Sequence, residues 1–207
     1  MLEKISGHGY CTVETKKETI ELTKMVKHIK GALVECGVAQ GVQLALFNYA
    51  DPTKEIWGFD SFVGIPHATH PKETQPAIGK VTPRKTGEHL ESTGISAHSQ
   101  KDVELNFDKW LVDTTKITLV KGWFENTMPD NKVGKISLLR LDGDMYEATR
   151  VCLKYLFPKL EKGGILIIDD WGLAGCRIAC DEYFGEYKRL KPLKPMNTNQ
   201  PMNFIKL

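Results

Sequence analysis

The sequence lacks any long apolar run and any strong excess of charge of one sign. No stretch approaches the about 18 consecutive apolar residues of a membrane-spanning helix, so no membrane span is expected. The formal net charge of +2 is too small to indicate binding of nucleic acid or of an acidic membrane surface. Residues 1–7 also lack the apolar core of a signal peptide. These absences leave a globular protein with small-molecule partners as the class to consider.

The cysteines show no disulfide framework, because the five of them are an odd number without regular spacing. Cys36 falls in a predicted buried strand and Cys152 in a predicted helix. Cys176 and Cys180 lie one helical turn apart, which could suit a soft metal ion. Since no His or Cys lies close to that pair in sequence, core packing is the preferred interpretation. We therefore expect reduced thiols and a cytoplasmic protein.

The chain of 207 residues predicts a single domain. Two segments of it carry separate expectations. Residues 1–30 are expected to form an arm and then a helix, with residues 7–10 either lying across a site or forming a disordered tail. Residues 63–100 are rich in proline and typical of a functional lid or a disordered insert, and we expect a mobile cover over the site. Its histidines could supply a base or a substrate contact, or could simply face solvent: His67, His70, His89 and His98.

The rest of the chain alternates apolar runs with helical patterns, which predicts an α/β fold with a mostly parallel sheet and helices on both faces. A helix over residues 99–112 is expected to bury Val103, Phe107, Trp110 and Leu111. The expected strands are residues 32–38, 55–62, 116–122, a run ending at 142 and a run ending at 169–170, followed by an antiparallel hairpin of residues 192–196 and 201–206.

Carboxylates follow two of these strands, Asp142 after the fourth and Asp169 and Asp170 after the fifth. Because open α/β sheets place their sites beyond the carboxyl ends of the strands, we expect these side chains to converge. Three adjacent carboxylates repel one another unless a cation lies between them, and oxygen ligands suit a hard ion such as Mg²⁺. The alternative is that Asp169 and Asp170 only begin a loop or cap the next helix.

The first two strands carry candidate cofactor contacts. Gly37 and Gly41 allow a close approach of the backbone to a ligand beside a helix N-terminus, although Gly-x-x-x-Gly is less than a dinucleotide fingerprint. Glu35, if buried without a partner, would cost on the order of several kcal/mol, so it should meet a ligand hydroxyl or amine, or a backbone amide. Asp60, roughly 20 residues further on, is placed either to bind ribose hydroxyls or to cap a helix.

Beyond the third strand, Trp123 and Phe124 follow Gly122 directly. The aromatic pair could form an adenine slot or could pack beneath the next helix.

Five segments of the chain occur in the same order in one known family. Through them, over about residues 30–185, the sequence resembles the macrocin O-methyltransferase family of S-adenosylmethionine-dependent enzymes. The resemblance implies a Rossmann-like class I methyltransferase fold and Mg²⁺-dependent methylation of a hydroxyl, typically on a sugar of a natural product. The segments are VECGV (34–38), FDSFVGIP (59–66), KGWFENTMP (121–129), LRLDGDMYEAT (139–149) and GGILIIDD (163–170).

The resemblance also implies roles for individual residues. The metal ligands of the family correspond to Asp142, Asp169 and Asp170, and Asp142 also corresponds to the proposed general base. The surroundings of the cofactor correspond to Glu35 and Gly37 at its methionine part, Asp60 at the ribose, and Ser61, Gly122, Trp123 and Phe124 at the nucleoside.

Two features depart from the family pattern. Ser61 stands where threonine is usual, and the N-terminus is short where members carry elements that cover the substrate or build a dimer. The identity of the acceptor and the presence of a homodimer therefore stay open.

The mechanism that follows is direct transfer of a methyl group from a sulfonium to a hydroxyl oxygen. Mg²⁺ would bind adjacent hydroxyls, lower the pKa of one and hold it in line, and Asp142 or solvent would take the proton. The acceptor should therefore carry vicinal oxygens, as a sugar diol or a catechol does. The alternatives are a nicotinamide-dependent oxidoreductase, disfavoured by the incomplete glycine fingerprint and Glu35, and a non-catalytic scaffold, disfavoured by the three carboxylates.

Overall fold

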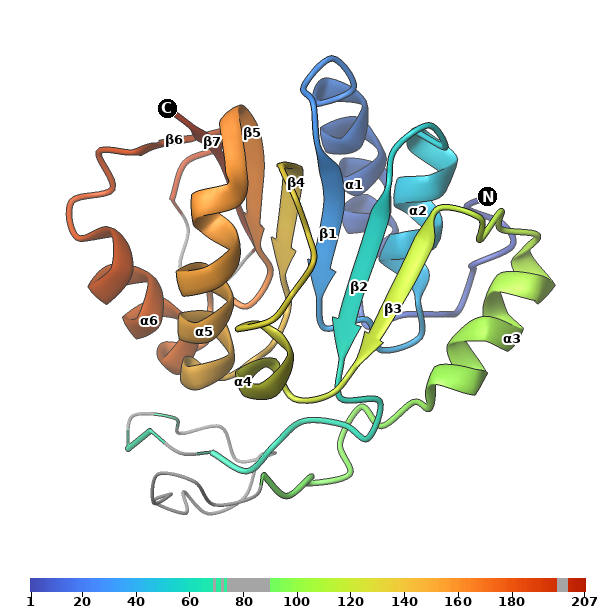
Figure 1. Ribbon diagram of the computed structural model, residues 1–207, viewed down its shortest axis with the longest axis horizontal. Coiled ribbons are helices and arrows are strands. Elements are labelled where there is room, and N and C mark those ends of the chain that lie inside the picture. Colours follow the sequence, from blue (N-terminus) through green and yellow to red (C-terminus); the bar gives the residue numbers. More distant parts are fainter. Residues whose placement is uncertain (69, 72, 74–89, 197–200) are drawn as a thin grey trace.

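Seven strands form one sheet in the computed structural model, which describes residues 1–68, 70, 71, 73, 90–196 and 201–207 (Figure 1). They are β1 (Ala32–Cys36), β2 (Ile56–Asp60), β3 (Ile117–Lys121), β4 (Ile136–Leu141), β5 (Leu160–Ile168), β6 (Leu190–Pro192) and β7 (Met202–Lys206). The order across the sheet is β3-β2-β1-β4-β5-β7-β6. Strands β1 to β5 are parallel, and β7 runs antiparallel to both β5 and β6. The predicted α/β sheet with its closing hairpin is confirmed.

Helices cover both faces of this sheet (Figure 1). The first set of helices, on one face, is α1 (Val13–Met25), α2 (Val42–Ala50) and α3 (Gln100–Trp110). The second set, on the other face, is α4 (Phe124–Thr127), α5 (Tyr146–Leu156) and α6 (Ala174–Phe184), with the short 3₁₀ turn η2 (Phe157–Lys159) before β5. Because successive side chains of a strand point to opposite faces, Leu138 of β4 packs with the first set of helices and Leu139 packs with the second. Within the described ranges, no helix is both long enough and apolar enough to cross a membrane.

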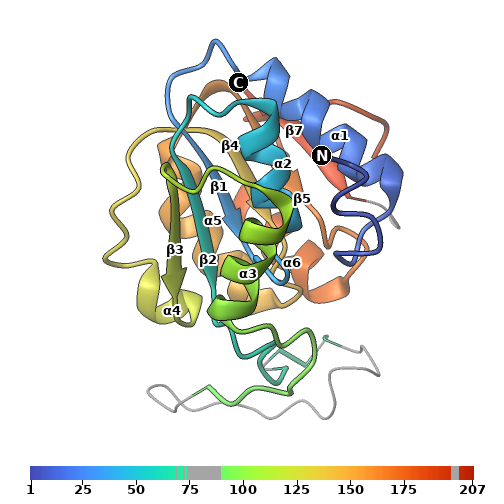
Figure 2. The ribbon, with the colours of Figure 1, turned by 90° about the vertical axis from the view of Figure 1, so that its right-hand side faces the viewer.

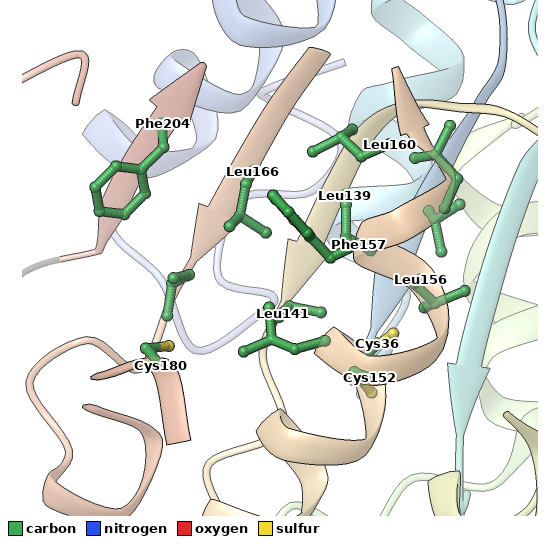
Figure 3. Packing of buried hydrophobic residues seen from close by; sticks show 14 of the residues in the cluster. Cys36, Leu139, Leu141, Cys152, Leu156, Phe157, Leu160, Leu166, Cys180 and Phe204 are labelled. Carbon is green, nitrogen blue, oxygen red and sulfur yellow. The ribbon is translucent and has the colours of Figure 1, made fainter. Parts of the chain in front are cut away.

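The core beneath α5 and α6 contains four of the cysteines. Cys36 of β1 meets Cys152 of α5, and burial raises the pKa of the Cys36 thiol well above its usual value (Figure 3). Cys176 and Cys180 of α6 are also buried among apolar side chains. Core packing, the preferred interpretation of this pair, matches their position.

Two element boundaries differ from the predictions for a local reason. The helix α3 ends at Trp110, and Leu111 then adopts a left-handed conformation (φ 58°) that leaves it 76% exposed, so the prediction that Leu111 points inward was wrong. The strand β6 spans Leu190–Pro192, so the predicted range of residues 192–196 was wrong in its bounds. The Leu193 amide still donates to the Asn203 carbonyl at 2.9 Å, and Pro195, which has no amide hydrogen, follows two residues later. The predicted polar turn at 197–200 lies outside the described residues.

The carboxyl ends of β1 and β4 approach closely, and this brings the candidate residues together. The amide of Asp142 donates to the carbonyl of Cys36 at 2.8 Å, which continues the pairing of the two strands by one residue. Gly37 follows with φ +98°, and a Cβ atom there would lie 1.7 Å from the carbonyl oxygen of Asp142. Only glycine fits this position, so it sets the distance between the loop after β1 and the first carboxylate.

Candidate functional site

A cavity of about 260 Å³ opens at the carboxyl ends of β1, β2, β4 and β5. Gly41 does not line it, because this glycine (φ +84°) begins α2 and packs against Val103 and Phe107 of α3. The structure brings all the other predicted site residues to its wall: Glu35, Gly37, Asp60, Ser61, Gly122, Trp123, Phe124, Asp142, Asp169 and Asp170.

Three carboxylates converge at one side of the cavity. Asp142, Asp169 and Asp170 each offer an oxygen atom, and these atoms lie within 4.8 Å of one another. Burial and the neighbouring Asp169 raise the pKa of Asp142 to about 7, although Arg140 opposes the shift. Burial and the nearby Asp144 and Asp142 raise the pKa of Asp170 well above its usual value. Oxygen-only donors with uncompensated negative charge fit a hard divalent cation.

Arg140 is the residue that the sequence interpretation missed. Its side chain is 2% exposed, and its Nη2 atom lies 2.9 Å from Asp142 Oδ2 and 2.7 Å from Asp169 Oδ1. The Nε atom lies 3.2 Å from Glu35 Oε1. Glu35 and Arg140 are register partners in β1 and β4, so two opposite charges in neighbouring apolar strands were the available signal.

The partner of Glu35 Oε1 is therefore the Arg140 guanidinium, whereas the sequence predicted a ligand group or a backbone amide as the partner. Its second oxygen, Oε2, is buried and has no hydrogen-bond partner among the described residues. Burial raises the pKa of this carboxyl well above its usual value, while Arg140 lowers it. A buried acceptor that lines a cavity and lacks a donor fits a ligand amine or hydroxyl.

Asp60 holds the backbone of two loops. Its Oδ2 accepts from the amides of Val38 (2.7 Å) and Ala39 (3.0 Å), and its Oδ1 accepts from the amide of Phe62 (2.7 Å). The carboxylate also faces the cavity. The two amides use both lone-pair directions of Oδ2. The Ser61 hydroxyl lies 3.4 Å from Oδ1 but only 2.8 Å from the Gly64 carbonyl, so one direction at Oδ1 is left for a ligand hydroxyl.

The aromatic pair lies at the cavity, and one of its two rings also packs against the helix α5. Trp123 and Phe124 line the cavity, and Phe124 also packs against a small buried cluster of Ala68, Met145 and Ala148. A Cβ atom at Gly143 would lie 3.1 Å from the Phe124 ring, which shows how closely the loop after β4 meets the aromatic side chain.

Asp144 is a further carboxylate that the sequence interpretation did not single out. It adopts a left-handed conformation (φ 61°) and lines the cavity, and its amide donates to Asp170 Oδ2 at 2.7 Å. Burial and the neighbouring Asp169 and Asp60 raise its pKa to about 6. Asp144 is not one of the three converging carboxylates, so its side chain remains available to a reacting ligand.

The N-terminal arm reaches the same cavity. Gly9, Tyr10 and Cys11 line its edge. The amide of Gly9 donates to Gln40 Oε1 at 2.7 Å, and the Tyr10 hydroxyl lies 3.0 Å from His98 Nε2. Residues 9–11 therefore lie across the site in this structure.

The described parts of the predicted lid, residues 63–68 and 90–98, lie beyond the carboxyl ends of the strands (Figure 1, Figure 2). His67 lines the cavity, and the ring of His70 stacks on Tyr146 with centroids 4.3 Å apart. His89 lies outside the described residues, as do residues 69 and 72 and the rest of 74–89. The mobile cover stays a prediction.

Comparison with known proteins identifies relatives over nearly the whole chain. The sequence profile of the Macrocin-O-methyltransferase (TylF) family matches residues 12–200. The 8-demethyl-8-(2,3-dimethoxy-alpha-L-rhamnosyl)-tetracenomycin-C 4'-O-methyltransferase of Streptomyces olivaceus is 31% identical over 201 residues, which cover 95% of this chain and 70% of that protein. The mycinamicin III 3''-O-methyltransferase of Micromonospora griseorubida is 32% identical over 198 residues, which cover 86% of this chain and 73% of that protein.

A solved structure agrees with this assignment at the level of the fold. The O-methyltransferase NovP superposes with a TM-score of 0.76 at 24% sequence identity, over 94% of this chain and 80% of that chain.

Replacement of Arg140 by methionine tests the ion cluster. The variant leaves the buried carboxylates without the guanidinium that neutralises them, which should destabilise the fold by about 3–5 kcal/mol at pH 8. The pKa of Asp142 is already raised to about 7, and the loss of Arg140 raises it further. A raised folded-state pKa favours the folded protein as the pH falls toward 4, so the loss should be smaller at pH 5.

The measurement is urea unfolding of both proteins at pH 5 and pH 8, with a chelator present. Arg150→Met, which removes an exposed pair with Glu147, is the control and should cost at most about 0.5 kcal/mol. An equal loss at both pH values for Arg140→Met would contradict the role of the carboxylates.

Proposed function

Because this chain belongs to the macrocin O-methyltransferase family and is an O-methyltransferase, we propose that its cavity binds S-adenosylmethionine and Mg²⁺. The acceptor in this proposal is a hydroxyl of a sugar or of another small molecule with vicinal oxygens. The observation that carries the proposal is the convergence of Asp142, Asp169 and Asp170 in the same cavity as the unpartnered oxygen of Glu35.

The cofactor half of the cavity comes from β1, β2 and the end of β3. Glu35 Oε2 would accept a hydrogen bond from the ammonium group of the cofactor, and Asp60 would accept from the ribose hydroxyls. Trp123 and Phe124 would contact the adenine, with Ser61 and Gly122 beside them. Bound S-adenosylmethionine supplies an electrophilic methyl group on a positively charged sulfur.

The metal half comes from the ends of β4 and β5. Asp142, Asp169 and Asp170 would hold Mg²⁺, which as a Lewis acid lowers the pKa of a bound hydroxyl. Arg140 fixes two of these carboxylates and leaves Asp170 free of contact with the guanidinium. This arrangement favours an acceptor with two adjacent oxygens, because both could face the same cation.

Proton transfer is better assigned to Asp144 than to Asp142, the base expected from the sequence. Asp142 accepts from Arg140 and would also bind the metal, and both interactions weaken it as a base. Asp144 lines the same cavity, and among the described residues it neither pairs with Arg140 nor belongs to the three converging carboxylates.

The sugar acceptor is supported by the relatives. The tetracenomycin enzyme is named for a substrate with a rhamnosyl group, and both named relatives are O-methyltransferases of natural products. The many carboxylates that line the cavity agree with a hydroxyl-rich acceptor.

Asp170→Asn separates metal binding from cofactor binding. The amide oxygen of asparagine can still accept from the Asp144 amide, but the variant lacks one anionic ligand. We expect Mg²⁺ affinity to fall at least about 10-fold while S-adenosylhomocysteine affinity changes little. Calorimetric titration of each ligand gives both values, and Asp130→Asn, at an exposed position, is the matched control. Unchanged Mg²⁺ affinity would mean that the metal site lies elsewhere.

Asp144→Asn tests the base. Loss of a general base lowers kcat by about 10²–10⁴-fold, and the affinities for cofactor and Mg²⁺ should be retained. The measurement is single-turnover methyl transfer over a range of pH. A variant that keeps the wild-type rate and pH profile would show that solvent or another group takes the proton.

A further inference from the structure

Glu73 lies in the segment 63–100, yet its side chain is inserted between two helices of the core domain and the residue is only 4% exposed. Its Oε1 atom accepts from the amide of Tyr146, 73 residues away, at 2.5 Å. Its Oε2 atom accepts from the amide of His70 at 2.9 Å. The helix α5 begins at Tyr146, and the N-cap residue is Met145, which has no side-chain oxygen. Glu73 therefore supplies the cap that the helix lacks locally.

Gly175 of α6 provides the space for this carboxylate. A Cβ atom at position 175 would lie 2.7 Å from Glu73 Cγ and 2.8 Å from Glu73 Oε1. Glycine within a helix is unfavourable relative to alanine, so its presence here has a packing reason. The start of α6 therefore leaves room for the Glu73 side chain.

A second contact strengthens the same junction. The ring of His70 stacks on Tyr146, and the Tyr146 hydroxyl donates to Glu182 Oε2 of α6 at 2.6 Å. Ala68 is buried against Met145 of the same region. The segment before Glu73 is thus held to the start of α5 by polar and apolar contacts together.

The junction connects two walls of the cavity. On one side, Ile65, Pro66 and His67 line it just before the anchored segment. On the other side, Asp144 lies two residues before Tyr146, in a left-handed conformation that its surroundings must maintain.

We propose that Glu73, seated against Gly175, is a positioning residue for the acceptor. It holds the wall formed by residues 65–67 at a fixed distance from Asp144, at the metal side of the cavity. The contacts proposed for the cofactor come from Glu35, Asp60 and Trp123, whereas Glu73 accepts from the amides of His70 and Tyr146. The identity of the acceptor in this inference rests on the proposed function, whereas the contacts that Glu73 makes with α5 and α6 are independent of it.

The kinetic test uses Glu73→Ala, Glu73→Gln and Gly175→Ala, with Glu91→Ala as the control at an exposed carboxylate of the same segment. Glu73→Ala and Gly175→Ala should each raise the KM for a vicinal-diol sugar about 10–100-fold. Their affinity for S-adenosylhomocysteine should stay within about twofold of the wild type, since the cofactor contacts are untouched. Glu73→Gln should recover only part of the loss, because its amide oxygen can still cap α5 while its NH₂ group cannot accept from the His70 amide.

Gly175→Ala is informative because helix propensity alone would make it favourable. The double variant Glu73→Ala/Gly175→Ala should be no worse than either single variant, since both remove one junction. Additive effects, or an equal loss of S-adenosylhomocysteine affinity, would overturn the proposal in favour of general damage to the fold.

A structural readout keeps the inference separate from the proposed activity. Hydrogen exchange at the Tyr146 amide and in residues 62–68 should accelerate in Glu73→Ala and Gly175→Ala and remain at the wild-type rate in Glu91→Ala. Unchanged exchange in both variants would overturn the junction. Accelerated exchange with no methyl transfer by the wild type to any diol would instead refute the proposed acceptor while leaving the junction in place.

Discussion

The ion cluster around Arg140 is the interaction on which the rest of the site depends. The buried guanidinium of Arg140, on β4, contacts Glu35 of the neighbouring strand β1. It also contacts Asp142 and Asp169 at the ends of β4 and β5. Such a cluster is stable only when its geometry is good, because each buried charge loses its hydration. It fixes the end of β1, where the cofactor is proposed to bind, relative to the ends of β4 and β5, where the metal ion is proposed to bind. The groups that it leaves uncompensated, Asp170 and the second oxygen of Glu35, are those proposed to meet ligands.

The strand ends could be predicted from the sequence because the signals there are local. Apolar runs that stop at Asp142, Asp169 and Asp170 identify buried strands, and the topology of an open α/β sheet then brings these carboxylates to one edge. Arg140 could not be placed in the same way, since its pairing with Glu35 requires the knowledge that β1 lies beside β4. That adjacency joins residues 105 positions apart, as the contact of Ser137 with Ala32 illustrates, and no local pattern encodes it.

The cavity walls outside the sheet were less predictable for a different reason. The arm at Tyr10 and the segment at Glu73 carry no hydrophobic period, and they are held by individual hydrogen bonds to distant residues such as His98 and Tyr146. A single glycine, Gly175, decides whether one of these contacts can form. Sequence periodicity therefore specifies the scaffold and the carboxylates at strand ends, whereas the shape of the outer cavity walls depends on specific contacts between remote segments.

The most direct test of the account is the metal dependence of methyl transfer by the wild-type protein. The measurement follows labelled methyl from S-adenosylmethionine to a sugar with vicinal hydroxyls, in the presence of Mg²⁺ and then of excess chelator, with the monodeoxy sugar as a matched acceptor. The account predicts transfer to the diol that stops in chelator and returns with Mg²⁺, and much weaker transfer to the monodeoxy sugar. Equal transfer with and without the metal would contradict the assignment of Asp142, Asp169 and Asp170 as its ligands.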